Sequence, residues 1–358
     1  MMMSEKRYIL QLFILLVVAL SCVGAFNYVV NPYLVLRDMR ISGFNAVKAD
    51  INGYVRQGKA YQPLSLPIDT LLVGNSRVEM GLDPSHPCLG GSAYNLGLPG
   101  AGIELQVAYA MNLLAQKPIK RVLMSLDFVD FLHVGQPTTG FHFIGQERLA
   151  YRIDGKPNRD YIWYRWQDYY LATLSLDALV SSVKTVLGQH AKASDRSPMG
   201  FNPARDLAAA TRMEGPYRVF QQKRRAMDAK YIGKTWVYQT QAAGNMNFPA
   251  LARLIEKTAA SKAQLAFFIS PLHQSFFTSL EAYGLSDEYQ LWRRDVMSFL
   301  RAQRVPLHDY AQISGITDEP LPQQNQRVGL RWFWEPAHYK SRLGNRLLRE
   351  MLGDHCSG

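Results

Sequence analysis

The chain has 358 residues, of which 47% are hydrophobic and 19% charged, a composition that excludes an intrinsically disordered protein. Its 40 Lys and Arg residues against 29 Asp and Glu give a formal net charge of +11. No lysine run carries this charge, so it fits anionic lipid headgroups or an anionic glycan better than nucleic acid. A diffuse basic surface that serves only solubility is the alternative.

The N-terminal segment predicts a membrane anchor. Residues 8–30 contain no charged side chain, and the run is about as long as a helix that crosses a bilayer. Because Lys6 and Arg7 precede it, the positive-inside rule predicts a cytoplasmic N-terminus and a domain outside the inner membrane, in the periplasm. A cleaved signal peptide with its site at Val23-Gly24-Ala25 is the alternative. The apolar run continues past these residues, which favours a retained anchor.

Cysteines are scarce, with Cys22 in the apolar run and Cys88 and Cys356 beyond it. In an oxidising compartment Cys88 and Cys356 could form a disulfide that ties two loops together. Two unpaired thiols are the other interpretation, and the sequence does not choose between them. No CxxC or His-rich spacing occurs, so we predict no metal site and no cofactor.

Beyond the anchor (residues 1–31), we predict a juxtamembrane linker over residues 32–66 and one domain over residues 67–358. Short apolar runs alternate with amphipathic periods in this domain. Strands are predicted at Thr70–Gly74, Ala93–Leu96, Arg121–Leu126, Gln264–Ile269 and Val305–Asp309. Helices are predicted at Ile103–Lys117, Phe248–Lys262, Asp287–Gln303 and residues 340–352. The alternation predicts an α/β fold, a three-layer α/β/α sandwich with a parallel sheet.

Residues 132–246 interrupt the alternation and are predicted to form a mostly helical, aromatic and basic insertion that acts as a cap or lid. Aromatic side chains at helical spacing, such as Trp163 and Trp166, are more typical of a hydrophobic core. A platform on which sugar rings stack is the alternative.

Several polar residues directly follow predicted strands, at the edge where parallel sheets bind ligands. Ser76 follows the first strand. A histidine is the usual base for a serine nucleophile, and an adjacent carboxylate orients it. His338, with Glu335 three residues before it, supplies such a pair near the C-terminus. The oxyanion would accept hydrogen bonds from Ser76 N–H, at a helix start, and from a backbone N–H of the glycine loop that begins at Gly97.

These residues resemble those of the SGNH (GDSL-type) hydrolases. The resemblance is strongest to the membrane-anchored group that modifies bacterial surface polysaccharides, including alginate O-acetylation proteins and the teichoic acid D-alanyl transfer protein. It covers about residues 67–132 and 265–352. Four segments carry it: Gly74-Asn75-Ser76-Arg77, Tyr94-Asn95-Leu96-Gly97-Leu98-Pro99-Gly100, Ser270-Pro271-Leu272-His273 and Phe333-Trp334-Glu335-Pro336-Ala337-His338-Tyr339.

The resemblance implies that Ser76 is the nucleophile, that His338 and Glu335 are the base and acid, and that Gly97 is an oxyanion donor. Two positions depart from the family pattern. Glu335 stands where the family has Asp, and Asp127 stands where it has an Asn donor. An ionised carboxylate cannot donate.

Either a residue such as Asn95 or Arg77 replaces the missing donor, or the oxyanion hole is weaker than in efficient esterases. Arg77 and Asp127 are also weak candidates for substrate binding. So is His273, for which a structural hydrogen bond to the backbone is an equal alternative.

The resulting expectation is an exported, membrane-anchored serine acyltransferase, most simply an acetyltransferase, that acts on a polysaccharide or other glycan. The resemblance also implies a partner, a multispanning membrane acyltransferase that exports acyl groups. Two alternatives remain: a carbohydrate or lipid esterase of the same fold, and an inactive scaffold of a polysaccharide biosynthesis complex.

Overall fold

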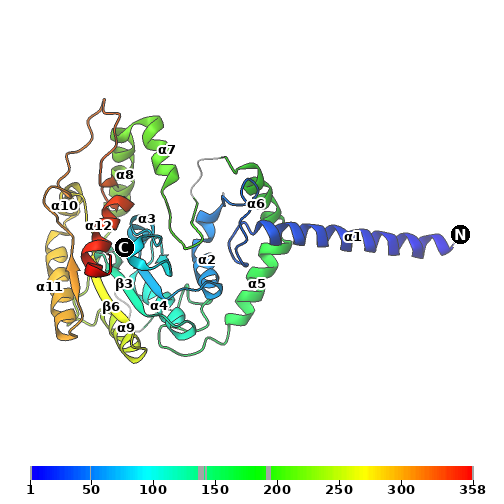
Figure 1. The fold of residues 1–358 in the computed structure, drawn as a ribbon, viewed down its shortest axis with the longest axis horizontal. Coiled ribbons are helices and arrows are strands. Elements are labelled where there is room, and N and C mark those ends of the chain that lie inside the picture. The colour runs from blue at the N-terminus through cyan, green and yellow to red at the C-terminus, as the bar shows by residue number, and fades with distance from the viewer. Residues whose placement is uncertain (1, 49, 136–140, 142, 191–194, 357–358) are drawn as a thin grey trace.

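The computed structural model describes residues 2–48, 50–135, 141, 143–190 and 195–356, and a five-stranded sheet lies at the centre of this part of the chain (Figure 1). All neighbouring strands are parallel, in the order β2-β1-β3-β6-β7. Gly74 lies beside Gly97 in the register, so the carboxyl ends of adjacent strands meet at one edge. The strands are β1 (Thr70–Gly74), β2 (Ala93–Gly97), β3 (Arg121–Leu126), β6 (Gln264–Ile269) and β7 (Leu307–Asp309).

Both faces of the sheet are buried. Side chains alternate between the faces of a strand, and in β1 Leu71 and Val73 join one hydrophobic cluster while Leu72 joins another. This explains why the strands read as continuous apolar runs. Helices complete both clusters. The cluster with Leu71 and Val73 includes residues of α4 (Ile103–Gln116), α9 (Asn247–Ala260), α10 (Gln274–Ala282) and α11 (Ser286–Ala302). The cluster with Leu72 includes residues of α3 (Ser76–Gly81) and α12 (Ser341–Leu352). The predicted α/β fold with a parallel sheet is confirmed.

Residues 32–66 are packed into the domain, so the prediction of a linker is wrong. Tyr33 and Tyr61 are buried in the larger cluster. Helix α2 (Val55–Tyr61) also carries the buried Lys59, whose Nζ donates to the carbonyl of Gly97 at 2.5 Å and lies 3.3 Å from the carboxylate of Glu79. The first half of the segment is irregular backbone and the second half consists of short helices, so no long periodic pattern marks it in the sequence.

The predicted insertion leaves the sheet after β3 and returns before α9. Strands β4 (Leu132–Val134) and β5 (Trp236–Tyr238) pair as an antiparallel ribbon where it begins and ends. The described residues between them form helices joined by long irregular segments. The helices are α5 (Tyr161–Leu174), α6 (Leu176–Leu187), α7 (Arg205–Glu214) and α8 (Pro216–Tyr231).

Helix α1 (Met2–Val30) projects from the body of the molecule (Figure 1). Over Glu5–Val30 it is long and apolar enough to cross a membrane. Its C-terminal end packs beside α5 and α6.

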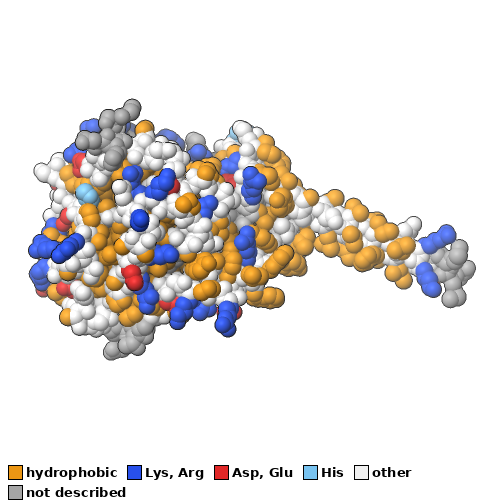
Figure 2. Space-filling model, turned by 60° about the horizontal axis from the view of Figure 1, so that its bottom comes forward, with side chains coloured by type: hydrophobic (Ala, Val, Ile, Leu, Met, Phe, Trp, Pro, Cys, Tyr) orange, Lys and Arg blue, Asp and Glu red, His pale blue; other side chains and the backbone are white. Residues whose placement is uncertain are grey.

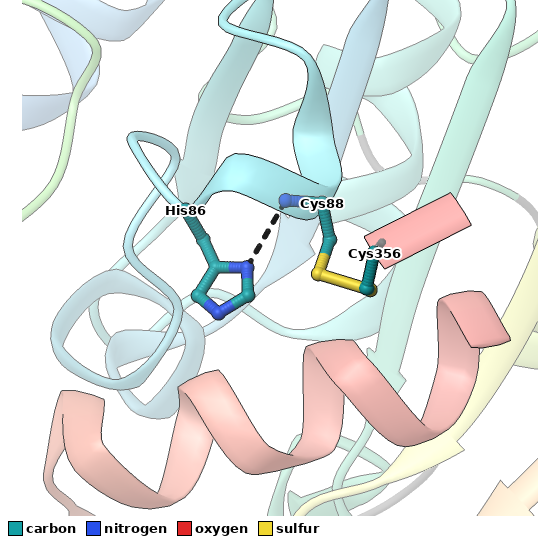
Figure 3. Close-up of a disulfide and its surroundings, with 3 residues drawn as sticks. All are labelled: His86, Cys88 and Cys356. Atoms are coloured by element: carbon teal, nitrogen blue, oxygen red, sulfur yellow. Dashed lines mark hydrogen bonds between the residues drawn. A yellow bond between two sulfur atoms is a disulfide. The ribbon is translucent and has the colours of Figure 1, made fainter. Parts of the chain in front are cut away.

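A disulfide joins Cys88 to Cys356 (Figure 3). Cys88 lies in a short 3-10 turn before β2, and Cys356 follows α12. The bond therefore connects the front of the domain to its C-terminal end, which is one of the two alternatives left open by the sequence. His86 accepts a hydrogen bond from the backbone N–H of Cys88 at 3.3 Å and caps the turn (Figure 3).

Candidate active site

Ser76 is the first residue of α3, and only Asn75 separates it from the end of β1. Asn75 caps this helix, because its side-chain oxygen accepts a hydrogen bond from the backbone N–H of Arg77 at 2.8 Å. The strand-to-helix turn thus holds the Ser76 hydroxyl at the carboxyl edge of the sheet, partly exposed to solvent.

His338 and Glu335 lie on a small antiparallel ribbon formed by β8 (Phe333–Glu335) and β9 (His338–Tyr339). The ribbon packs against α3 through Tyr339, whose ring lies so close to Gly81 that any side chain at Gly81 would collide with it. Glycine at this position lets the ribbon approach the helix that begins with Ser76.

The three side chains form a continuous chain of hydrogen bonds. Ser76 Oγ lies 2.7 Å from His338 Nε2. His338 Nδ1 contacts Glu335 Oε1, and Glu335 Oε2 accepts from the backbone N–H of Ala337 at 3.1 Å. A proton on Nδ1 that is donated to Glu335 leaves Nε2 free to accept from the serine. The structure thus joins three residues that span 262 positions.

Glu335 is buried, which by itself would raise the pKa of its carboxyl group. The adjacent His338, the Ala337 N–H and the charge of Arg77 outweigh burial and hold the Glu335 pKa below its ordinary value. The carboxylate therefore stays ionised at neutral pH and stabilises an imidazolium at His338.

Two predicted oxyanion donors are wrong. The backbone N–H of Gly97 donates to the side-chain oxygen of Asn95 at 2.9 Å. The Asn95 amide nitrogen donates to the carbonyls of Val78 and Leu82, both at 2.8 Å, and the side chain is fully buried. Asn95 therefore fixes β2 to α3, and neither group points into the site.

Gly100 is an alternative candidate for the second donor, with Ser76 as the first. Both residues line the same cleft, and no described residue accepts a hydrogen bond from the backbone N–H of either. Gly100 has φ 66°, a conformation that favours glycine, and open space surrounds its Cα. The Asn95-x-Gly97-x-x-Gly100 spacing contains both glycines, and only the hydrogen bonds of the folded chain tell them apart.

Arg77 and Asp127 bind each other beside the cleft. Arg77 also lines the cleft with Ser76, so its role in substrate binding stays a prediction, whereas Asp127 is not among the lining residues. Arg77 Nη1 lies 3.1 Å from Asp127 Oδ1, and both side chains are almost fully buried. Asp127 Oδ2 accepts from Ser125 Oγ at 2.9 Å. Arg77 Nε donates to the carbonyl of Ala337 at 2.8 Å. Arg77 thus secures the turn between Glu335 and His338.

His273 is fully buried and caps α10, so it does not contact substrate. Its Nδ1 accepts from the backbone N–H of Ser275 at 3.1 Å, and its Nε2 donates to the carbonyl of Glu319 at 2.7 Å. Burial lowers the pKa of this histidine, which favours the neutral ring. The structural alternative for His273 is confirmed.

Asp130 is a member of the site that the sequence analysis missed. Its Oδ2 accepts hydrogen bonds from Asn75 Nδ2 and Gln106 Nε2, both at 2.8 Å. Burial, reinforced by the negative charge of Asp127, raises the pKa of Asp130 to about 7. Asp130 therefore lies beside the cap of the helix that begins with Ser76 and changes charge near neutral pH.

The insertion forms one wall of the cleft. Helix α8 contributes Lys223, Met227 and Lys230, of which the two lysines are exposed to solvent. The same cleft is lined by Ser76 and His338. Helix α7 of the insertion adds the exposed acid Asp206, so the insertion brings both signs of charge to the cleft.

No protein-family model matches this chain, and no curated protein matches it. Any functional assignment therefore depends on the geometry of the site.

Proposed function

We propose that this protein is an SGNH-type serine acyltransferase, with a three-layer α/β/α domain on the outer face of the inner membrane, which modifies hydroxyl groups of an exported polysaccharide. The observation that carries the proposal is the chain from Ser76 Oγ through His338 to the ionised Glu335. This arrangement is the one that activates a serine hydroxyl for attack on an ester.

In the first half-reaction, Ser76 Oγ attacks the acyl carbonyl carbon of the donor while His338 Nε2 takes the hydroxyl proton. The N–H groups of Ser76 and Gly100 donate to the resulting oxyanion. When the tetrahedral intermediate collapses, the bond to the donor's oxygen or sulfur breaks, and His338 returns its proton to that leaving atom. The acyl group is then an ester on Ser76.

In the second half-reaction, a hydroxyl of the acceptor attacks the acyl-enzyme and His338 takes its proton. Collapse breaks the Ser76–acyl bond, and the proton passes to Ser76 Oγ. Water in place of the acceptor gives hydrolysis with the same residues, so selectivity between transfer and hydrolysis depends on what fills the cleft.

Three features support an exported glycan as acceptor. Helix α1 can span a membrane. The Cys88–Cys356 disulfide is typical of an oxidising compartment. Lys223 and Lys230 are exposed cations of the cleft wall that could pair with a uronic acid or another anionic sugar, although Asp206 of the same wall is an acid. A multispanning acyltransferase would supply the acyl group, because a single helix cannot carry one across the membrane.

The test uses the full-length protein in detergent, p-nitrophenyl acetate as donor, and an oligouronate or a neutral cello-oligosaccharide as acceptor. Mass spectrometry of the oligosaccharides should show acetylation, more on the oligouronate, and none with Ser76→Ala. Release of acetate without acetylated sugar would favour an esterase. Neither product from folded wild-type protein would overturn the proposal.

A further inference from the structure

Helices α5 and α6 are buried by their polar sides and expose their apolar sides. On the buried side, Asp168 accepts hydrogen bonds from Tyr61 Oη at 2.7 Å and from Arg148 Nε at 2.6 Å, and Ser181 Oγ donates to Asp50 at 2.8 Å. The exposed side is apolar over both helices: Ile162, Trp163, Trp166, Tyr170, Leu171, Leu174, Leu176, Val180, Val183 and Leu187. A helix of a water-soluble protein is arranged the opposite way.

This exposed side, named here the α5–α6 face, is large and has few charges. Trp163 is 73% exposed, Leu176 78% and Leu187 79%. Within α5 and α6, Asp177 and Lys184 are the only charged side chains that are fully exposed. A contiguous apolar patch of this kind marks a surface that contacts a lipid or a partner.

The α5–α6 face is continuous with the membrane helix. Asn27 Nδ2 of α1 donates to the carbonyl of Thr173 at 2.8 Å, and Leu174 contacts Gly24. In Figure 1, α5 and α6 lie crosswise to α1 at its base. Hydrophobic side chains continue from α1 onto the body around this point (Figure 2).

The C-terminal end of α1 is firmly attached to the domain. Lys48 Nζ, fully buried, donates to the carbonyl of Val30 at 2.6 Å, and Asn45 Nδ2 donates to the carbonyl of Val29 at 2.7 Å. Both are terminal carbonyls of the helix, where a cation and side-chain donors are favourable. The direction of α1 thus determines how the α5–α6 face is oriented towards the bilayer.

The length of α1 determines its depth. The helix is fully exposed from Tyr8 to Cys22 and packs against the body beyond that point. About 15 residues at a rise of about 1.5 Å cover ~22 Å. The hydrocarbon core is about 30 Å thick. If Lys6 and Arg7 lie at the cytoplasmic surface of the bilayer, the exposed part of α1 crosses all but ~8 Å of the hydrocarbon core. This last ~8 Å is at the level where α1 meets α5 and α6.

We propose that the α5–α6 face lies in the membrane interface, parallel to the bilayer plane, with its apolar side chains in the boundary between headgroups and acyl chains. Tryptophan and tyrosine side chains favour this depth in a membrane, and Trp163, Trp166 and Tyr170 would lie there. The domain is thus held on the membrane surface at a fixed height by α1 and this helix pair together. The proposal does not depend on the acyl-transfer assignment.

The test measures tryptophan fluorescence of the full-length protein in vesicles of phosphatidylethanolamine and phosphatidylglycerol whose acyl chains are brominated near the headgroup. α1 contains no tryptophan, so quenching reports on the body of the protein. Trp163→Phe/Trp166→Phe should lose more than about half of the quenching seen with wild type, because both side chains lie at lipid depth. The matched control, Trp332→Phe, removes a tryptophan next to β8 and should keep the wild-type quenching.

Equal lipid quenching in the wild type and the folded double variant would overturn the proposal. The proposal would also be overturned if Trp163 and Trp166 stayed accessible to aqueous iodide in pure lipid vesicles and became protected only in native membranes. That result would assign the α5–α6 face to a protein partner instead of the bilayer. Thermal unfolding of each variant shows that it is folded.

Discussion

At the residue scale, His338 connects the two halves of the candidate site, since one ring nitrogen contacts Ser76 and the other contacts Glu335. His338→Ala should lower hydrolysis of p-nitrophenyl acetate by roughly 10⁴-fold or more, because triad residues act as a unit. His308→Ala, on β7, is the matched control and should keep the wild-type rate. A folded His338→Ala variant with an unchanged rate would exclude His338 as the base.

Asp130 should give the protein a pH-dependent stability. Its pKa is about 7 in the folded chain, against about 3.9 in an unfolded one. Between these values the folded state keeps a proton that the unfolded state has lost. The stability from this group is therefore present at low pH and is lost as the pH rises through 7.

Asp130→Asn removes this loss, so the Tm of the variant relative to wild type should rise between pH 5 and pH 8. Thermal unfolding in detergent at both pH values measures it. Glu256→Gln, an exposed site on α9, should show no such trend. A relative Tm for Asp130→Asn that is constant or falls with pH would contradict the assignment.

Sequence alone could identify the three residues of the candidate triad and could not identify the residues that support them. Ser76 follows a strand, and Glu335 and His338 are close in the chain, so local pattern reveals them. The choice between Gly97 and Gly100 depends on where the Asn95 side chain turns after folding. Asp130 becomes significant only because Gln106 and Asn75 meet it from other elements.

At the scale of elements, the β8–β9 ribbon is held in place by the buried Arg77. Arg77→Ala leaves the carboxylate of Asp127 without its cation, so the free energy of unfolding should fall by about 3–5 kcal/mol. Arg77→Ala/Asp127→Asn should recover part of this loss, because no unpaired charge remains. Chemical denaturation measures both, and a single variant as stable as wild type would exclude the pair as a structural support.

The regular elements were predictable because alternation and helical period are local signals, as in β1 and α4. The segment 32–66 was not predictable, because Tyr33 lies in irregular backbone and Lys59 and Tyr61 lie in the seven-residue helix α2, and all three are buried by long-range contacts. From the sequence, Lys59 would be predicted to lie on the surface. Its contacts with Glu79 and Gly97 explain why it is buried instead.

At the scale of the whole molecule, the disulfide closes a loop with a sequence separation of 268. Cys88→Ser/Cys356→Ser should lower the free energy of unfolding by about 2–5 kcal/mol, because it frees the unfolded chain from this constraint. Denaturation under oxidising conditions measures the change, with Cys22→Ser as the matched control. Two free thiols at Cys88 and Cys356 in the purified native protein would contradict the pairing.

The sequence also indicated the anchor, but it could not indicate the α5–α6 face. Apolar residues at helical spacing show that a helix has one apolar side, and they do not show whether that side faces a core or a lipid. Trp163 and Trp166 fit a core prediction until the structure shows both exposed, on a helix whose C-terminal end contacts α1.

The central claim, that Ser76 is an activated nucleophile, is tested most directly with a fluorophosphonate, which forms a covalent bond with such a serine. The account predicts one adduct on wild-type protein, located at Ser76 by peptide mass spectrometry, and none on Ser76→Ala or His338→Ala. Labelling of another residue, or no labelling of folded wild-type protein, would contradict it.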